Sequence, residues 1–189
     1  MMIKRTGMLT VLVLAATLAA ADRSPADGPQ YTQDGQLMRP QNYREWIFLS
    51  SGLGMTYGPL RATGAPRFDN VFASPSAYKA FLETGRWPDK TVLMLEVRNS
   101  ASQESINRDG HFQTEVVGLE AHVKDESRFP EKWAFFGFRG DAGAAKAVPR
   151  GSACQQCHAK EGAVDETFVQ FYPTLLKAAK EKGTLKQVK

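Results

Sequence analysis

Residues 91–97 read Thr-Val-Leu-Met-Leu-Glu-Val, which is the most apolar strand candidate in the chain. A continuous apolar run of this length is typical of a β-strand that is covered on both faces. The run therefore predicts the central strand of a sheet, and the other segments can be placed around it.

The next strand candidate, Glu115–Lys124, alternates between two faces. One face carries Val117, Leu119, Ala121 and Val123, and the other carries Val116, Gly118, Glu120, His122 and Lys124. Such alternation is typical of a strand with one face on the core and the other in water. The pattern therefore predicts that His122 lies at the surface among charged neighbours and is not a ligand.

Three further segments are expected to join this sheet. They are residues 43–49, 71–72 and 133–138, and the last contains four aromatic side chains. Most connections are short and polar, and Ser50–Pro66 and Gly140–Gly151 are expected to be loops. We predict a mainly β, α+β fold, with an antiparallel sheet of about five strands and a few helices packed at one end.

Helix boundaries are also visible in the sequence. Pro75 follows a serine that can cap free amides, so a helix is expected from there to Gly85. Asp165 is expected to cap a short helix. Pro173 is expected to begin a last helix that ends near Gly183.

One pentapeptide, Cys154-Gln155-Gln156-Cys157-His158, carries the clearest chemical signal. It holds the only two cysteines of the chain, near its C-terminal end. Cys-x-x-Cys-His is typical of a c-type haem attachment site. Each thiol can add to a haem vinyl group, and the histidine can ligate the iron. We predict one covalently attached haem c, bound through Cys154 and Cys157, with His158 as the proximal iron ligand.

Two other interpretations of the cysteine pair stay open. A redox-active disulfide needs a βαβ context, whereas this pair follows the loop that ends at Ser152, and the adjacent His158 would be unexplained. A structural zinc site needs a fourth ligand beyond two thiolates and one imidazole. The remaining histidines, His111 and His122, have no second paired motif around them.

The N-terminus has the features of a secretory signal peptide. Lys4 and Arg5 precede an apolar stretch, Met8–Ala20, that is short for a membrane span, and small residues follow it. A retained membrane anchor is the alternative. We expect residues 1–21 to direct export to the periplasm, residues 22–41 to form a flexible leader, and residues 42–189 to form one haem domain.

The net charge of +4 does not indicate a nucleic-acid partner. Lys4 and Arg5 account for two of the 24 basic residues, which leaves 22 against 20 acidic residues in the exported chain. The remaining basic excess lies in the C-terminal tail, where a solvated helix end explains it. No arginine-and-aromatic pattern of an RNA-binding sheet is present in the sequence.

Five short motifs follow one another along the chain. They are Asn42-Tyr43-Arg44-Glu45-Trp46, Gly118-Leu119-Glu120-Ala121, Trp133-Ala134-Phe135-Phe136, the cysteine pentapeptide, and Phe171-Tyr172-Pro173. In this order they resemble the cytochrome P-460 family, which includes the β-sheet cytochromes called c-prime-beta. The resemblance covers about Asn42 to Leu176. It implies an antiparallel β fold, a homodimer, a proximal histidine, here His158, and an open distal position on the iron.

The resemblance implies one of two activities. Members with a lysine cross-linked to the porphyrin oxidise hydroxylamine, with nitric oxide as an intermediate species, whereas members without it bind gases. The lysine precedes a glutamate in a strand motif that resembles Thr91–Val97, and matching that glutamate to Glu96 places Leu95 at the lysine position. No lysine occurs between Lys90 and Lys124. Leu95 therefore favours five-coordinate haem that binds NO or CO in an apolar distal pocket.

Two other functions stay open beside this non-enzymatic gas binder. An oxidoreductase acting on hydroxylamine or NO could use Glu96 or Glu115 as an acid–base group. An electron carrier with a redox partner would have six-coordinate iron, with Met55 or Met94 as the sixth ligand. Aromatic candidates to cap the iron, each equally consistent with core packing, are Phe48, Phe68 and Phe72.

Overall fold

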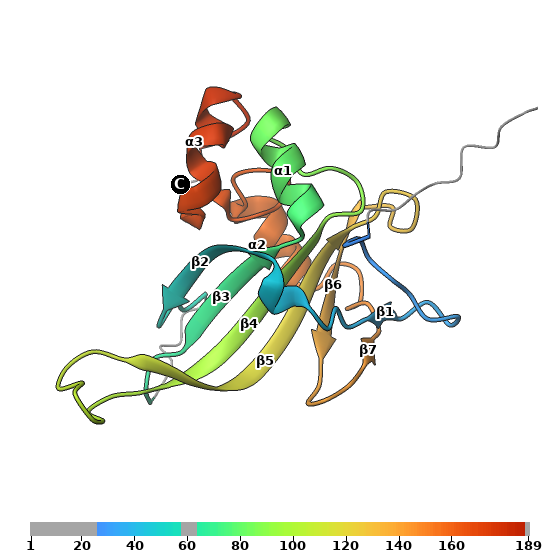
Figure 1. The fold of residues 1–189 in the computed structure, drawn as a ribbon. Helices are drawn as coiled ribbons and strands as arrows, with labels where there is room; N and C mark the ends of the chain where they lie inside the picture. The colour runs from blue at the N-terminus through green and yellow to red at the C-terminus, as the bar shows by residue number, and fades with distance from the viewer. Residues whose placement is uncertain (1–25, 58–63, 188–189) are drawn as a thin grey trace, which may run out of the picture.

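The computed structural model describes residues 26–57 and 64–187, and its centre is a five-stranded antiparallel sheet (Figure 1). The strands lie in the order β2-β3-β4-β5-β6, so each pairs with its neighbour in the chain. Their bounds are β2 Ile47–Leu53, β3 Phe68–Ala73, β4 Val92–Ala101, β5 Phe112–Lys124 and β6 Trp133–Phe138. The predicted mainly β fold with about five antiparallel strands is confirmed.

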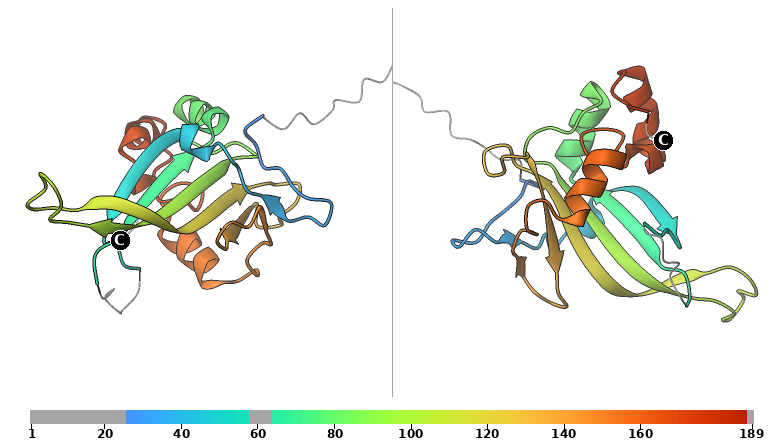
Figure 2. Two further views of the ribbon diagram at one scale, coloured as in Figure 1. Left: turned by 60° about the horizontal axis from the view of Figure 1, so that its bottom comes forward. Right: turned by 180° about the vertical axis from the view of Figure 1, so that it is seen from behind.

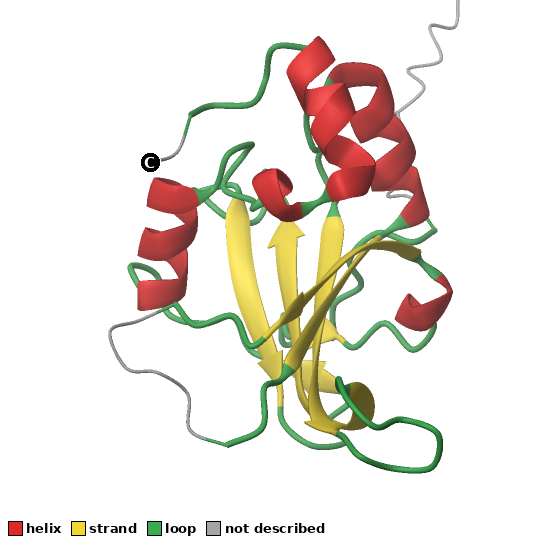
Figure 3. Cartoon of the chain, turned by 90° about the vertical axis from the view of Figure 1, so that its left-hand side faces the viewer, coloured by secondary structure: helices red, strands yellow, loops and turns green. Residues whose placement is uncertain are grey.

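The remaining elements surround this sheet. A two-stranded sheet pairs β1 with β7, the helices α1 and α3 lie together at one end of the main strands, and α2 lies apart from them, next to β6 (Figures 2 and 3). Their bounds are β1 Leu37–Met38, β7 Ala144–Ala145, α1 Pro75–Thr84, α2 Ala153–Glu161 and α3 Pro173–Glu181, with 3₁₀ turns at Tyr43–Glu45 and Val169–Phe171. None of the helices within the described ranges is both long and apolar enough to cross a membrane.

Two buried clusters cover the two faces of the sheet. The first contains Leu37, Tyr43, Trp46, Val92, Met94, Leu119, Ala121, Val123, Ala134, Phe136, Phe138 and Ala145. The second packs α1 and α3 against the other face and contains Leu49, Ala73, Ala77, Phe81, Trp87, Leu93, Trp133, Val164, Val169, Tyr172, Leu175 and Ala179. Successive residues of β4 alternate between the clusters. The apolar run at residues 91–97 is therefore a strand covered on both faces, as predicted.

Residues 26–41 pack against the domain, which corrects our expectation of a flexible leader for this part of the chain. Leu37 is fully buried in the first cluster. The hydroxyl of Tyr31 donates to Asp125 at 3.1 Å, and Asp27 accepts from the backbone nitrogen and the hydroxyl of Ser76 at 2.7 and 2.6 Å. The polar composition of this segment gave no indication in the sequence of these few contacts. Residues 22–25 and the expected signal peptide lie outside the described residues.

Strand β2 differs from the expected boundaries at both ends. It begins at Ile47, because Tyr43–Glu45 form a 3₁₀ turn, and it continues to Leu53, inside the segment expected to be a loop. A bulge between Phe48 and Ser50 interrupts its pairing with β3. The polar residues that follow are compatible with a strand here because β2 is an edge strand, and all but one of its residues are exposed or half-buried.

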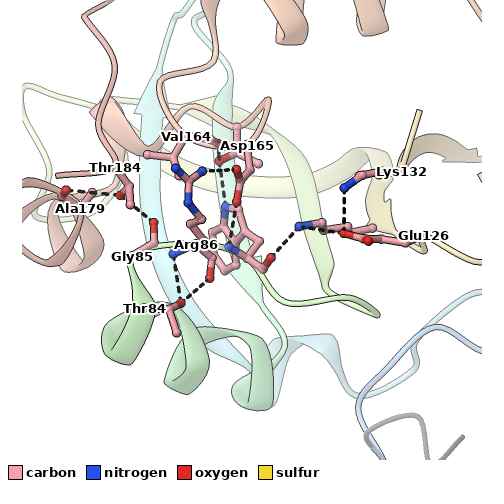
Figure 4. A network of polar contacts seen from close by, with 12 residues as sticks. Thr84, Gly85, Arg86, Glu126, Lys132, Val164, Asp165, Ala179 and Thr184 are labelled. Atoms are coloured by element: carbon pink, nitrogen blue, oxygen red, sulfur yellow. Dashed lines mark hydrogen bonds and ion pairs between the residues drawn. The ribbon is translucent and has the colours of Figure 1, made fainter. Parts of the chain in front are cut away.

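Helix α1 has the predicted bounds, and Gly85 ends it in the left-handed conformation, with φ 73°. A Cβ at this position would lie 2.6 Å from Lys182 Cβ, and the Thr184 hydroxyl donates to the Gly85 carbonyl at 2.7 Å (Figure 4). We expect Gly85→Ala to lower the free energy of unfolding by about 1–2 kcal/mol, because it adds backbone strain and a clash. Urea denaturation measures this change. Lys79→Ala, at an exposed position of α1, is the control, and equal losses in both variants would contradict the prediction.

Glu96 lies on the first-cluster face, where Tyr43, Arg44 and Arg98 surround its buried carboxylate. The Tyr43 hydroxyl and the Nε atoms of Arg44 and Arg98 donate to it, the last two at 2.8 and 2.5 Å. Burial by itself raises the pKa of Glu96, but these hydrogen bonds outweigh burial and hold the pKa below its usual value. This carboxylate therefore stabilises the fold above the pKa of the unfolded chain, about 4.3, and that stability is lost as the pH falls through the folded-state pKa.

We expect Glu96→Gln to lower the free energy of unfolding at pH 7 by about 2 kcal/mol, because two arginines lose a charged partner. The variant should also lose less stability than the parent protein between pH 5 and pH 3. Denaturant titrations at several pH values measure both effects. Glu45→Gln, at an exposed position, is the control. Parallel stability curves for the parent and Glu96→Gln proteins would contradict this role.

Candidate functional site

The cysteines and the histidine of the pentapeptide share one face of α2. Cys154, Cys157 and His158 are spaced i, i+3 and i+4, which brings their side chains to the same side of a helix. The hydroxyl of Ser152, at the N-cap, accepts from the backbone nitrogen of Gln155 at 3.4 Å. Both cysteines are free thiols in the structure. The start of α2 therefore fixes a set of two sulfur atoms and one imidazole.

This face of α2 opens onto a cavity of about 470 Å³ between the helix and the main sheet. The volume lies within the range of cofactor sites in proteins. Apolar lining residues come from the sheet and from the segment after α2, and they include Val71, Leu93, Leu95, Val97, Phe135, Phe168 and Phe171. Leu95, predicted to lie at the distal position, therefore shares this cavity with Cys154, Cys157 and His158.

One nitrogen of His158 is held by the backbone. Its Nδ1 lies 2.8 Å from the carbonyl oxygen of Glu166, to which it donates. Burial lowers the pKa of His158, although the hydrogen bond with Glu166 opposes this shift. A neutral imidazole whose Nδ1 is engaged has Nε2 available as a metal ligand.

The loop that carries Glu166 is fixed by Arg86 and Trp87. Asp165 accepts from the Arg86 guanidinium at 3.0 Å (Figure 4) and from the Trp87 backbone nitrogen at 3.1 Å. The Trp87 indole nitrogen donates to the Thr167 hydroxyl at 2.9 Å. Asp165 itself has a positive φ of 45° and caps no helix, which corrects our expectation. Its role is to hold the turn that orients His158.

Most other candidates from the sequence lie away from the cavity. Glu96 lies on the opposite face of the sheet, and Glu115 is exposed and accepts from Asn99 at 2.6 Å. Met94 borders the cavity but packs in the first cluster, whereas Met55 lines the cavity. None of the three suggested aromatic caps is among the described lining residues, namely Phe48, Phe68 and Phe72.

His122 is buried, so the prediction of a surface histidine was wrong. Its side chain is only 7% exposed and lines the cavity next to His158. Burial lowers the pKa of His122 well below its usual value, and the neighbouring His158 lowers it further, so the ring is neutral. The alternation along β5 assigned the correct face. It could not indicate that α2 and the loop around Glu166 cover that face.

The sequence pattern did not single out two carboxyl groups that lie near Leu95. Glu120 is the cross-strand partner of Leu95, and Asp69 is the partner of Val97. Burial raises the pKa of both carboxyl groups, and the charge of Asp69 raises that of Glu120 further. The Tyr57 hydroxyl lies 3.4 Å from Asp69 and donates to it. The sequence had suggested that the surface around Leu95 is apolar. These carboxyl groups show that it is partly polar.

The donor set fits a covalently attached haem better than the alternatives. Two thiols and a neutral, oriented imidazole face a largely apolar cavity of suitable size. The main sheet is antiparallel, so the βαβ context of a redox disulfide is missing from the described chain. A zinc site finds no support, because the described residues contain no group of three or more His, Cys, Asp or Glu side chains that could hold a metal ion.

Comparison with known proteins agrees with the assignment of a haem site. The family model for cytochrome P460 matches residues 40–169, a span that includes the main sheet, α2 and the loop that orients His158. No curated protein matches the chain. The resemblance seen in the short motifs is thus found independently over more than half of the sequence.

Proposed function

Because the chain belongs to the cytochrome P460 family, a family of c-type haem cytochromes, we propose that it is a gas-binding protein with a single haem. In this proposal, Cys154 and Cys157 form thioethers to the porphyrin, and His158 is the proximal iron ligand. When bound, the haem would supply an iron that can take a neutral diatomic such as NO or CO.

The position of Leu95 carries the proposal. It lies in the cavity, between Val71 and Glu120 in the cross-strand row, where the resemblance would place a cross-linking lysine. No lysine is found among the described residues that line the cavity. A leucine can neither cross-link nor ligate, so it supports an iron that keeps one face open. The apolar contact at Leu95 favours NO and CO over O₂, because bound O₂ needs a hydrogen-bond donor and the Tyr57 hydroxyl already donates to Asp69.

Optical and resonance Raman spectra of the purified ferrous protein test the proposal. We expect high-spin five-coordinate haem without added ligand, and new bands on addition of NO or CO. The variant Met55→Leu is the matched control, since Met55 is the methionine whose side chain remains as a candidate sixth ligand. Its spectrum should equal that of the parent protein. A low-spin six-coordinate spectrum that becomes high-spin in Met55→Leu would support an electron carrier instead.

A second candidate function, oxidation of hydroxylamine or NO, is favoured by Glu120 and Asp69. Both carboxyl groups line the cavity, where either could exchange a proton with a bound substrate, and partial burial raises the pKa of each. Steady-state turnover with hydroxylamine and an electron acceptor decides between the two functions. If the protein is an enzyme, Glu120→Gln should lower kcat by roughly 10²-fold, whereas Glu126→Gln should not. Mass spectrometry under denaturing conditions would reveal any third bond to the porphyrin.

We further propose export to the periplasm and assembly into a homodimer. Export is supported by the signal-like residues 1–21, and the dimer by the family resemblance alone. The mass of the protein recovered from the periplasm should equal that of a chain without the first 21 residues. Analytical ultracentrifugation of the haem-loaded protein measures the oligomeric state, and a monomer at micromolar concentration would contradict the dimer.

A further inference from the structure

The ring of His122 is enclosed by three other rings. It stacks on Phe135 with a centroid distance of 4.0 Å and an interplanar angle of 12°, and it lies 4.2 Å from Trp133 on a tilted plane. Its third neighbour is the ring of His158, with a centroid distance of 4.8 Å and an interplanar angle of 76°, which is an edge-to-face contact. Strand β5 places His122 between its pairing partners Leu93 and Phe135, so its backbone is held on both sides.

The two nitrogens of this ring make no hydrogen bond within the described chain. Both Nδ1 and Nε2 are buried, and neither has a protein partner there. A neutral imidazole carries one donor and one acceptor, and a buried polar group that is left unpaired destabilises a fold. A phenylalanine could stack on the same neighbours without this penalty. The choice of histidine therefore points to a role in the site and not in folding.

We propose that His122 is a positioning residue for His158 in the haem site. Its edge contact, together with the hydrogen bond from His158 to Glu166, fixes the rotation of the proximal imidazole from two sides. The ring nitrogens of His122, which have no partner among the described residues, also make the ring that contacts His158 polar, which phenylalanine would not. Residues that orient a metal ligand in this way tune the strength of the metal–ligand bond.

The test compares ferrous haem-loaded proteins by the iron–histidine stretching band in resonance Raman spectra and by the rate of NO dissociation. His122→Phe keeps the stacked ring but removes both nitrogens, and His122→Asn removes the ring contact with His158. Val123→Ala is the control, because Val123 is the next residue of β5 and is fully buried in the first cluster on the opposite face.

We expect both His122 variants to shift the stretching band and to change the NO dissociation rate on the order of tenfold. The control should keep the parent values, although its melting temperature falls. His122→Phe should melt at or above the temperature of the parent protein. If His122→Phe fails to fold, the band and the NO dissociation rate of His122→Asn alone test the proposal.

Parent values of the band and the rate in the variants that fold would overturn the inference. The inference rests on the proposed ligation by His158 but not on the identity of the gas. A failure of that ligation is distinguishable, because the parent protein itself would then lack an iron–histidine band.

Discussion

The double variant Cys154→Ala/Cys157→Ala is expected to leave a haem-loading periplasm without any covalently bound haem. The sequence contains no other cysteine, so no thiol remains to form a thioether. Coordination by His158 alone does not survive denaturation. Haem staining after denaturing electrophoresis should therefore fall from full signal to background, and the mass should equal that of the bare polypeptide. Each single variant should retain one thioether and stain more weakly.

A matched control for this variant lies within the same helical turn. Gln155 and Gln156 stand between the cysteines, and their side chains bond to the backbone nitrogen and the carbonyl oxygen of Gly151, each at 2.7 Å. Gln155→Ala/Gln156→Ala therefore perturbs the start of α2 and keeps both thiols. We expect it to retain haem. A haem-stained band from the double cysteine variant would contradict thioether attachment.

The second large effect is expected from His158→Ala. The thioethers should keep the porphyrin in place, but the iron should lose its proximal nitrogen, and the iron–histidine band should disappear. The space left in the cage of Phe135, His122 and Phe168, whose ring centroids lie 4.3–4.8 Å from that of His158, can accept a small planar base. Added imidazole should therefore restore the band and much of the parent optical spectrum.

His111→Ala is the control for this experiment. His111 is exposed, and the Ser100 hydroxyl, at 3.3 Å, is its side-chain partner. Its spectrum should equal that of the parent protein with or without imidazole. An unchanged iron–histidine band in His158→Ala would show that another residue ligates the iron, and His122, which lines the same cavity, would be the next to replace.

The parts of the fold that the sequence could predict are those set by local patterns. The run at residues 91–97 predicted a strand covered on both faces, the aromatic segment 133–138 predicted β6 with its observed bounds, and Pro75 and Gly85 predicted the ends of α1. In each case the physical cause lies within a few residues: side-chain burial on both faces, or backbone geometry that only proline or glycine fits readily.

The parts that could not be predicted depend on what covers a face from far along the chain. Alternation placed His122 and Glu120 on the same side of β5, but only the later α2 and the loop at Glu166 make that side a cavity wall. Asp69 reaches the same wall from β3. The motif predicts which side chains hold the haem, whereas the carboxyl groups around Leu95 needed the tertiary structure.

The segment before the family match has a practical consequence for shortened versions of the protein. A chain cut at residue 40, where the match begins, would lack Leu37, Tyr31 and the aspartate that binds the first turn of α1. Part of the apolar face that contains Tyr43 and Trp46 would then meet water. Such a patch promotes association between molecules, so a version trimmed to the family boundary should precipitate on expression, while one that begins at residue 26 should stay in solution.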